Sequence, residues 1–330
     1  MHIRVTYPVT QGQLFLRTDH DWDVNLAPVR VDGASSFFEL DFSAQTHAMK
    51  PVIVDGDQLH WSKGPNYVLS EHEPDPDIWP FFFASEHGHI SAMEHVTFEG
   101  MTLAVRTYFP AGYDENTLRR FPVLYMQDGN NLFFPEEAFL GNDWRVDETM
   151  DRLDQMNAIR KTVVIGISPA DRMRDYTNPG YEAYGRFVVQ HLKPLIDARV
   201  RTRTSPQETA VMGSSLGGVA ALYLAWQYPH VFGRAGCLSS TFGLMDDLFE
   251  RIATEPKRDI VVYLDSGWPR DNFDATNAMR DLLMERGYTL GVDLLQFSFP
   301  EGTHHEHSWA ARLHLPFQFF FGRSWCAQRG

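Results

Sequence analysis

The chain has 330 residues, of which 43% are hydrophobic and 22% charged, a composition typical of a globular protein with one large or two unequal domains. Its formal net charge is −14. Proteins that bind nucleic acids or anionic membranes need basic surfaces, so this charge disfavours both kinds of partner.

The cysteine count and the lengths of the apolar segments indicate the cellular compartment. Only Cys237 and Cys326 occur, without the Cys or His spacing of a zinc site. The first residues lack the apolar run of a signal peptide, and no segment reaches the ~20 apolar residues that span a bilayer. We therefore expect a cytoplasmic protein without a disulfide framework.

Residues 1–90 contain short apolar runs separated by turn residues, without the 3.6-residue period of a helix. This pattern predicts a small all-β sandwich as an N-terminal domain. The predicted strands are Val5–Tyr7, Gln13–Leu16, Ala27–Val31, Phe37–Phe42 and Pro51–Val54. Glu71–Asp77, rich in proline and acid, predicts a linker, and we expect the apolar Ile78–Phe83 to pack between two domains.

Strand-like and helix-like segments alternate over residues 91–330, the predicted second domain. Val163–Ile167 and Ile260–Leu264 are continuously apolar, as strands buried on both faces should be. The alternation predicts an α/β fold with a mostly parallel sheet between helices. The predicted strands are Val96–Phe98, Leu103–Phe109, Val123–Met126, Val163–Ile167, Thr209–Met212, Arg234–Leu238, Ile260–Leu264 and Leu294–Phe299, and the predicted helices are Trp144–Gln155, Tyr181–Arg199, Leu216–Tyr228, Asn272–Arg286 and Ser308–Phe321.

A G-x-S-x-G motif, Gly213–Gly217, joins the predicted strand Thr209–Met212 to the predicted helix Leu216–Tyr228. Between a strand and a helix this motif forms a nucleophile elbow, with Ser215 at the turn. Glycines beside the serine tolerate the strained backbone, and the helix N-terminus favours a developing negative charge. The alternative is a strand-to-helix turn that is merely rich in small residues.

The hydroxyl of Ser215 needs a base to become a nucleophile. His304, His305 and His307 follow the last predicted strand, where the chain order serine, acid, histidine puts that base. Three histidines in four positions are also compatible with a metal site, but their spacing is not H-E-x-x-H and no matching ligand set is evident. A solvated loop is the third interpretation.

An acid that orients the histidine is expected after the penultimate predicted strand, where Asp265, Asp271 and Asp274 occur. We predict Asp271. Asp265, directly at the strand end, is suited to accepting hydrogen bonds from turn N–H groups, and Asp274 to the first turn of the next helix. Glu306 is a further alternative, although it is only two residues from His304.

Two backbone N–H groups are expected to stabilise an oxyanion. One donor is Leu216, which follows the nucleophile. The other is Asn130, in the loop after Val123–Met126, where Gly129 lets backbone approach a substrate. The alternative for Asp128-Gly129-Asn130 is a plain tight turn.

In combination, these segments resemble the esterase branch of the α/β-hydrolases, which includes esterase D, enterochelin esterase, feruloyl and acetylxylan esterases and the mycolyltransferases. The resemblance covers about residues 95–322 and rests on Val123–Phe133, Gly213–Gly218, Tyr263–Gly267 and His304-x-Glu306-x-x-Trp309. The last segment is similar to the family's H-N-E-A-A-W, which singles out His304 among the three histidines. Asn130-Asn131 departs from the His-Gly-Gly or Gln-Asn types of many relatives.

The N-terminal region resembles the β-sandwich that precedes several of these esterases, including starch-binding-like and enterochelin-esterase N-terminal modules. Asp55–Tyr67 carries this similarity. A carbohydrate site there would stack sugars on exposed aromatic rings, for which Trp22 and Trp61 are the candidates. We expect core tryptophans instead, in a domain that covers one side of the active site.

These observations predict a serine carboxylesterase in which Ser215 attacks an ester carbonyl, His304 transfers the proton and Asp271 orients His304. A small-molecule or carbohydrate-linked ester is the expected substrate. No metal or organic cofactor is implied, and a homo-oligomer stays open. Two alternatives remain: an acyltransferase with the same triad, and a non-catalytic carbohydrate- or partner-binding protein on a hydrolase scaffold.

Overall fold

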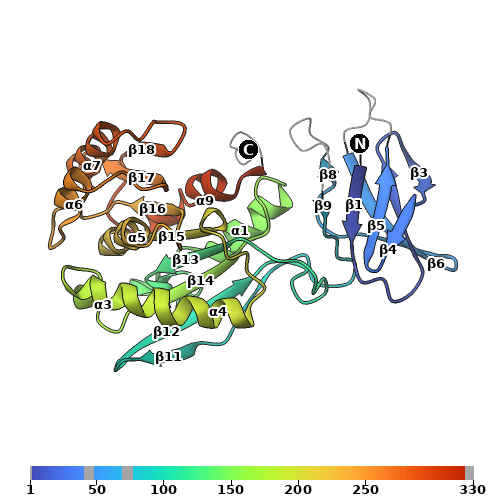
Figure 1. The fold of residues 1–330 in the computed structure, drawn as a ribbon, viewed down its shortest axis with the longest axis horizontal. Coiled ribbons are helices and arrows are strands. Elements are labelled where there is room, and N and C mark those ends of the chain that lie inside the picture. The colour runs from blue at the N-terminus through green and yellow to red at the C-terminus, as the bar shows by residue number, and fades with distance from the viewer. Residues whose placement is uncertain (1, 41–47, 69–76, 324–330) are drawn as a thin grey trace.

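The computed structural model describes residues 2–40, 48–68 and 77–323 (Figure 1). Asp41 and Phe42 of one predicted strand, residues 71–76 of the predicted linker, and Cys326 lie outside these ranges. Two regions differ in fold, a sandwich of strands and an α/β unit. The α/β-hydrolase fold with a preceding β-sandwich, expected from the sequence, is confirmed, while the domain boundary at residue 90 stays a prediction.

The N-terminal region consists of two sheets that share one apolar core. The first sheet has the order β4-β5-β1-β9, and the second has the order β3-β2-β6-β7, with β8 also paired to β6. Val5, Leu16 and Phe38 lie in the core between them. The strands are β1 (His2–Thr6), β2 (Gln13–Thr18), β3 (Asp21–Leu26), β4 (Arg30–Asp32), β5 (Ser35–Glu39), β6 (Ala48–Asp55), β7 (Gln58–Trp61), β8 (Tyr67–Val68) and β9 (Asp77–Ile78).

Strands β3 and β7 were absent from the sequence prediction. Their residues are mostly exposed, so they lack the alternation of apolar and polar residues that reveals a half-buried strand. The expectation of core tryptophans is also wrong. Trp61 is 37% exposed, Trp22 is partly exposed, their rings are 6.1 Å apart, and the Arg17 guanidinium lies over the Trp61 ring.

The α/β region is built on a sheet with the order β10-β12-β14-β13-β15-β16-β17-β18, with β11 paired to β12. The six strands from β14 to β18 in this order are parallel, and β12 runs antiparallel to β14. The strands are β10 (His89–Ile90), β11 (Glu94–Phe98), β12 (Met101–Phe109), β13 (Val123–Gln127), β14 (Val163–Ser168), β15 (Thr209–Ser214), β16 (Arg234–Leu238), β17 (Val261–Trp268) and β18 (Leu294–Pro300).

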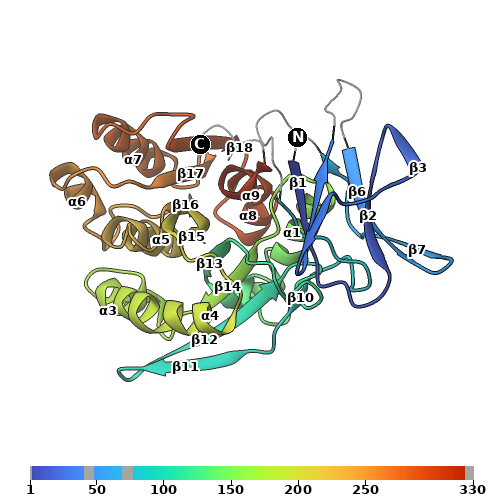
Figure 2. The ribbon, with the colours of Figure 1, turned by 45° about the vertical axis from the view of Figure 1, so that its right-hand side comes forward.

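Helices cover both faces of this sheet because the central strands are apolar on both sides. In β13, Val123 and Tyr125 point into one core, while Leu124 and Met126 point into the other. The first core is covered by α3 (Gly180–Phe187), α4 (Lys193–Arg199), α5 (Leu216–Gln227), α6 (Leu248–Thr254) and α7 (Phe273–Glu285). The second is covered by α1 (Val146–Gln155), α8 (Glu306–Ala310) and α9 (His314–Phe321), on the side nearer the N-terminal strands (Figure 2).

Two predicted long helices are interrupted, and prolines explain both breaks. The predicted helix Tyr181–Arg199 contains a π-helical turn, η3 (Val188–Leu192), before Pro194, which has no N–H for the carbonyl four residues earlier. The predicted helix Ser308–Phe321 divides into α8 and α9, because Pro316 likewise cannot donate to Arg312. The short helices α2 (Arg172–Asp175) and α6 were missed by the prediction.

The N-terminal region is attached at the amino-terminal edge of the parallel strands. Glu115 accepts hydrogen bonds from the Tyr7 hydroxyl and from the N–H groups of Phe82, Phe83 and Ala84. The Asn116 amide donates to the carbonyls of Thr6 and Pro80. Glu115 and Asn116 both precede β13, so these contacts lie at the edge where that strand begins.

Packing of Ile78–Phe83 at this junction, as predicted, is observed for Phe81 and Phe82. Phe82 packs on Tyr7 with 4.8 Å between ring centroids, and the Lys161 ammonium lies over the Phe81 ring. The parallel strands rise about 20 Å from this edge to their carboxyl ends, at ~3.3 Å per residue over the six residues of β15. The expectation that this region covers one side of the active site stays a prediction.

Candidate active site

Ser215 occupies a sharp turn between β15 and α5. Its backbone has φ 55° and ψ −123°, a strained conformation for any residue that has a side chain. Close packing explains the first glycine of the motif and the glycine that follows the motif: a Cβ on Gly213 would lie 2.5 Å from the Gly217 backbone, and one on Gly218 would lie 1.9 Å from Ser240 Oγ. The sequence therefore imposes the elbow sterically, and the Ser215 side chain emerges at the carboxyl edge of the sheet.

His304 lies on the loop between β18 and α8, and its ring bridges two side chains. Its Nε2 is 2.9 Å from Ser215 Oγ, and its Nδ1 is 2.7 Å from Asp271 Oδ1. With the proton on Nδ1, the ring donates to Asp271 and accepts from the Ser215 hydroxyl. The Trp309 ring packs edge-on against the imidazole, with 5.1 Å between centroids. The three residues predicted as a triad are thus brought together.

Asp271 is almost completely buried on the loop between β17 and α7. Its second oxygen, Oδ2, accepts hydrogen bonds from the Gly267 N–H at 2.7 Å and from the Ser239 hydroxyl. Burial alone would raise the pKa of this carboxyl. Hydrogen bonds from His304, Ser239 and Gly267 outweigh burial and hold the pKa of Asp271 below its ordinary value, so it stays ionised beside the imidazole.

Asp265 has a different environment from the one expected. The prediction that it bonds turn N–H groups is wrong, because it is fully buried and forms an ion pair with Arg312 at 2.9 Å. The Tyr263 hydroxyl donates to its other oxygen at 3.0 Å. Burial raises the pKa of Asp265 to about 6, although Arg312 and Tyr263 oppose this shift.

A layer behind the triad was missed by the sequence analysis. Ser239 Oγ donates to Asp271 and accepts from the Trp309 indole N–H and the Arg312 guanidinium. Arg312 also lies 3.6 Å from Asp271, so it stands between the two buried carboxylates. The only sequence signal was Trp309 in the histidine motif, because an arginine near a helix end ordinarily predicts an exposed side chain.

The loop after β13 approaches the elbow from the neighbouring strand. Asp128 has a left-handed backbone (φ 55°) and a buried carboxylate held by the Arg172 side chain at 2.8 and 3.0 Å. The Asn131 N–H closes the turn on the Asp128 carbonyl at 2.8 Å. The Asn130 N–H, predicted as an oxyanion donor, lies inside this turn. The other predicted donor is the Leu216 N–H, which has no intrahelical partner because it is at the start of α5.

The other two histidines have local roles. His305 precedes α8 and its Nδ1 accepts the N–H of His307, which is exposed. Within the described ranges, no group of three or more His, Cys, Asp or Glu side chains could hold a metal ion. Over the same residues, no helix has the length and apolarity needed to cross a membrane.

The parallel sheet, the strained serine and the histidine on the loop after the last strand define an α/β-hydrolase. Residues 99–318 match the family model described as "Putative esterase", and the chain belongs to this family. The resemblance seen in the sequence is thereby confirmed, and the class is that of carboxylic ester hydrolases.

Relatives and solved structures extend this comparison. "Uncharacterized protein YbbA" of Bacillus subtilis is 24% identical over 66% of this chain and 92% of its own length. An endo-1,4-beta-xylanase/feruloyl esterase of Xylanibacter ruminicola is 24% identical over 70% of this chain, which spans only 31% of that protein.

A ferulic acid esterase from the anaerobic fungus Anaeromyces mucronatus shares the fold with a TM-score of 0.55 at 17% identity, over 71% of this chain and 91% of that chain. The enterobactin esterase of Shigella flexneri has a TM-score of 0.55 at 12% identity, over 97% of this chain and 92% of that chain. The second likeness therefore includes the N-terminal region.

Proposed function

We propose that the protein is a serine carboxylesterase that forms an acyl-enzyme on Ser215. The observation that carries the proposal is the unbroken hydrogen-bonded series from Ser215 Oγ through His304 to Asp271, with distances of 2.9 and 2.7 Å. The strained backbone of Ser215 supports the same role, because such strain is costly and is kept where it serves chemistry.

In acylation, Ser215 Oγ forms a bond to the ester carbonyl carbon while His304 Nε2 takes the hydroxyl proton. The carbonyl oxygen becomes an oxyanion, which the N–H groups of Asn130 and Leu216 stabilise. Collapse of this intermediate breaks the ester C–O bond. The proton held on His304 passes to the leaving alkoxide, and the alcohol departs.

In deacylation, His304 takes a proton from water, and the resulting hydroxide bonds to the acyl carbon. The second tetrahedral intermediate breaks its bond to Ser215 Oγ, which recovers the proton from His304. Two buried carboxylates and one buried guanidinium lie behind the imidazole. Their net negative charge favours the imidazolium that forms at each step.

The test of the mechanism is hydrolysis of a panel of p-nitrophenyl esters, together with labelling by a fluorophosphonate probe. Ser215→Ala should lose at least about 10⁴-fold in kcat with wild-type thermal stability, and the probe should label wild type on Ser215. Hydrolysis by Ser215→Ala at near the wild-type rate, or labelling elsewhere, would refute the nucleophile.

Histidine variants supply a matched control. His304→Ala should lose several orders of magnitude in kcat, whereas His307→Ala, an exposed neighbour three residues away, should keep the wild-type rate. Inactivation by a chelator with recovery on adding zinc would contradict the triad. A competing alcohol or sugar should not divert the acyl group; if transfer exceeds hydrolysis at low millimolar acceptor, the protein is an acyltransferase.

For the natural substrate we propose small-molecule or carbohydrate-linked esters. The support is the likeness to a ferulic acid esterase and an enterobactin esterase, together with the location of Ser215 at the edge opposite the N-terminal region. Feruloyl sugars, acetylated sugars and a catecholate lactone, compared by kcat/KM, should separate these classes. Equal low rates for all three would contradict this substrate range.

A further inference from the structure

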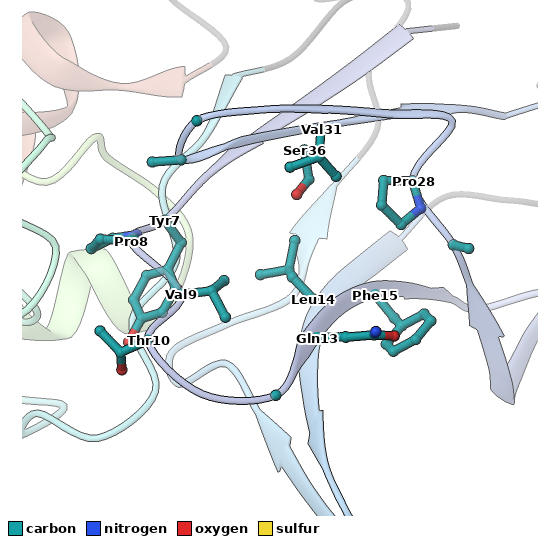
Figure 3. A pocket seen from close by; sticks show the side chains of 14 residues that line it. Tyr7, Pro8, Val9, Thr10, Gln13, Leu14, Phe15, Pro28, Val31 and Ser36 are labelled. Atoms are coloured by element: carbon teal, nitrogen blue, oxygen red, sulfur yellow. The ribbon is translucent and has the colours of Figure 1, made fainter.

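A cavity of about 740 Å³ opens between the two sheets of the N-terminal region. Its walls come from the loop between β1 and β2, the start of β2, and the chain that crosses from β3 to β5. Figure 3 shows Val9, Leu14 and Ser36 directed into the same space. Small-molecule sites range from roughly 300 to 1,000 Å³, so the volume suits a ligand with two or three rings or a medium-length chain.

The chemistry of the walls defines the ligand. The lining contains no Asp, Glu, Lys, Arg or His, although 22% of the chain is charged. Most lining side chains are apolar, and the Tyr7 hydroxyl is already bonded to Glu115. Thr10, Gln13 and Ser36 leave a few uncharged polar groups. A charged ligand would lose its hydration here without a partner, and a sugar would find too few hydrogen bonds.

Strand β4 shows how the sequence keeps charge away from this space. Arg30 and Asp32 lie on one face, where Arg30 stacks on Phe37 and pairs with Asp32 at 3.3 Å. Val31, between them, faces the cavity and is nevertheless 62% exposed. An apolar side chain at this position is neither packed in a core nor replaced by a polar residue, as expected at the mouth of an apolar site.

We propose that this cavity binds an uncharged, predominantly apolar small molecule, at a site separate from Ser215. The two sites lie beyond opposite edges of the parallel sheet, because the Tyr7 wall is joined to Glu115 ahead of β13 and Ser215 follows the end of β15. A molecule bound in this cavity is therefore not the ester that Ser215 attacks. This proposal does not depend on the esterase mechanism.

The test uses N-phenyl-1-naphthylamine, an uncharged fluorescent probe, with the full chain. One saturable site per chain is expected, and Ser215→Ala should bind as wild type does. The anionic relative 1-anilinonaphthalene-8-sulfonate should bind at least tenfold more weakly. Absence of saturable binding, or preference for the anion, would overturn the proposal.

Variants locate the site. Val31→Asp should weaken binding of the probe at least tenfold, whereas Val29→Asp, equally exposed at 62% but outside the lining, should stay within twofold. Gln13→Glu places a negative charge at a second position of the lining. Because Gln13 is exposed and the change is isosteric, it should leave the core undisturbed and should also weaken binding of the probe. Equal effects of Val29→Asp and Val31→Asp would refute the location. A dimer that Val31→Asp dissociates, without probe binding, would show a second copy as the occupant.

Discussion

The interiors of the two regions differ in how completely they are filled and in whether they contain charged groups. In the α/β region, every residue of β13 and β15 is buried, and the charged groups behind Ser215 are paired with one another. In the N-terminal region, β4 is entirely exposed and a cavity separates the sheets at one end. A catalytic site needs fixed charges in a dry environment, whereas a site for apolar ligands needs unfilled space and no charge.

The largest expected effect concerns the carboxylate that contacts His304. Asp271→Asn keeps the shape of the side chain but cannot hold His304 with a proton on Nδ1, so kcat should fall by up to about 10⁴-fold at neutral pH. Ester hydrolysis and circular dichroism measure the loss and the fold. Asp274→Asn, on the exposed surface of α7, should retain the wild-type rate. Near-normal turnover by Asp271→Asn would leave a Ser–His dyad.

The next effect concerns stability of the same region. Arg312→Met leaves Asp265 and Asp271 buried without their shared cation, which should lower the free energy of unfolding by about 3–5 kcal/mol at pH 7. The double variant Asp265→Asn/Arg312→Met should recover most of that loss, because it no longer buries an unpaired charge at position 265. Urea unfolding measures both, and equal instability of the two variants would contradict the pairing.

At the junction between the regions the effect should be smaller and should spare catalysis. Glu115→Ala removes the acceptor of three backbone N–H groups and the Tyr7 hydroxyl, which should cost about 2–3 kcal/mol of stability. Because Ser215 lies at the other edge of the sheet, kcat should change less than twofold. Asp114→Ala, an exposed neighbour, is the control and should cost under about 0.5 kcal/mol.

The smallest effect is a pH dependence. Burial raises the pKa of Asp265 to about 6, above the ~3.9 of an unfolded chain, so the folded protein binds more protons between these values and loses stability as pH rises through them. Wild type should therefore lose about 1–3 kcal/mol relative to Asp265→Asn between about pH 4 and pH 7. Parallel urea-unfolding curves for the two proteins would contradict this shift.

The lowered pKa of Asp271 acts in the opposite direction. Its ionised form contributes stability above the pKa of the unfolded chain, ~3.9, and that contribution is lost as pH falls through the still lower folded pKa. Comparisons made above about pH 4 therefore isolate Asp265. Below that pH, the free energy of unfolding of wild type should fall towards that of Asp271→Asn, which lacks the ionised carboxylate at every pH.

The α/β elements were predictable because burial on both faces leaves a simple pattern. Val163–Ile167 is apolar throughout and forms most of β14, and the glycine-flanked Ser215 marks the junction of β15 and α5. Asp271 was predicted correctly as the neighbour of His304, but the reason given for excluding Asp265 was wrong. Its partner Arg312 is 47 positions away along the chain, and local turn chemistry says nothing about such a contact.

The N-terminal region was harder to predict for a physical reason. Strands β3 and β7 are held by hydrogen bonds along sheet edges, and their side chains face solvent on most positions. Such strands carry little periodic signal. Trp22 and Trp61 were expected in the core because that is the commoner place for tryptophan, yet their rings pack on each other near the surface, with Arg17 over the Trp61 ring.

Attachment of the sandwich through Glu115 and Asn116 also affects how this protein can diversify. The junction uses residues that precede β13, whereas the loops that shape the reactive centre follow β13, β17 and β18. Insertions in those loops can change which ester is accepted without touching the junction. The sandwich can likewise change its own ligand without altering those loops.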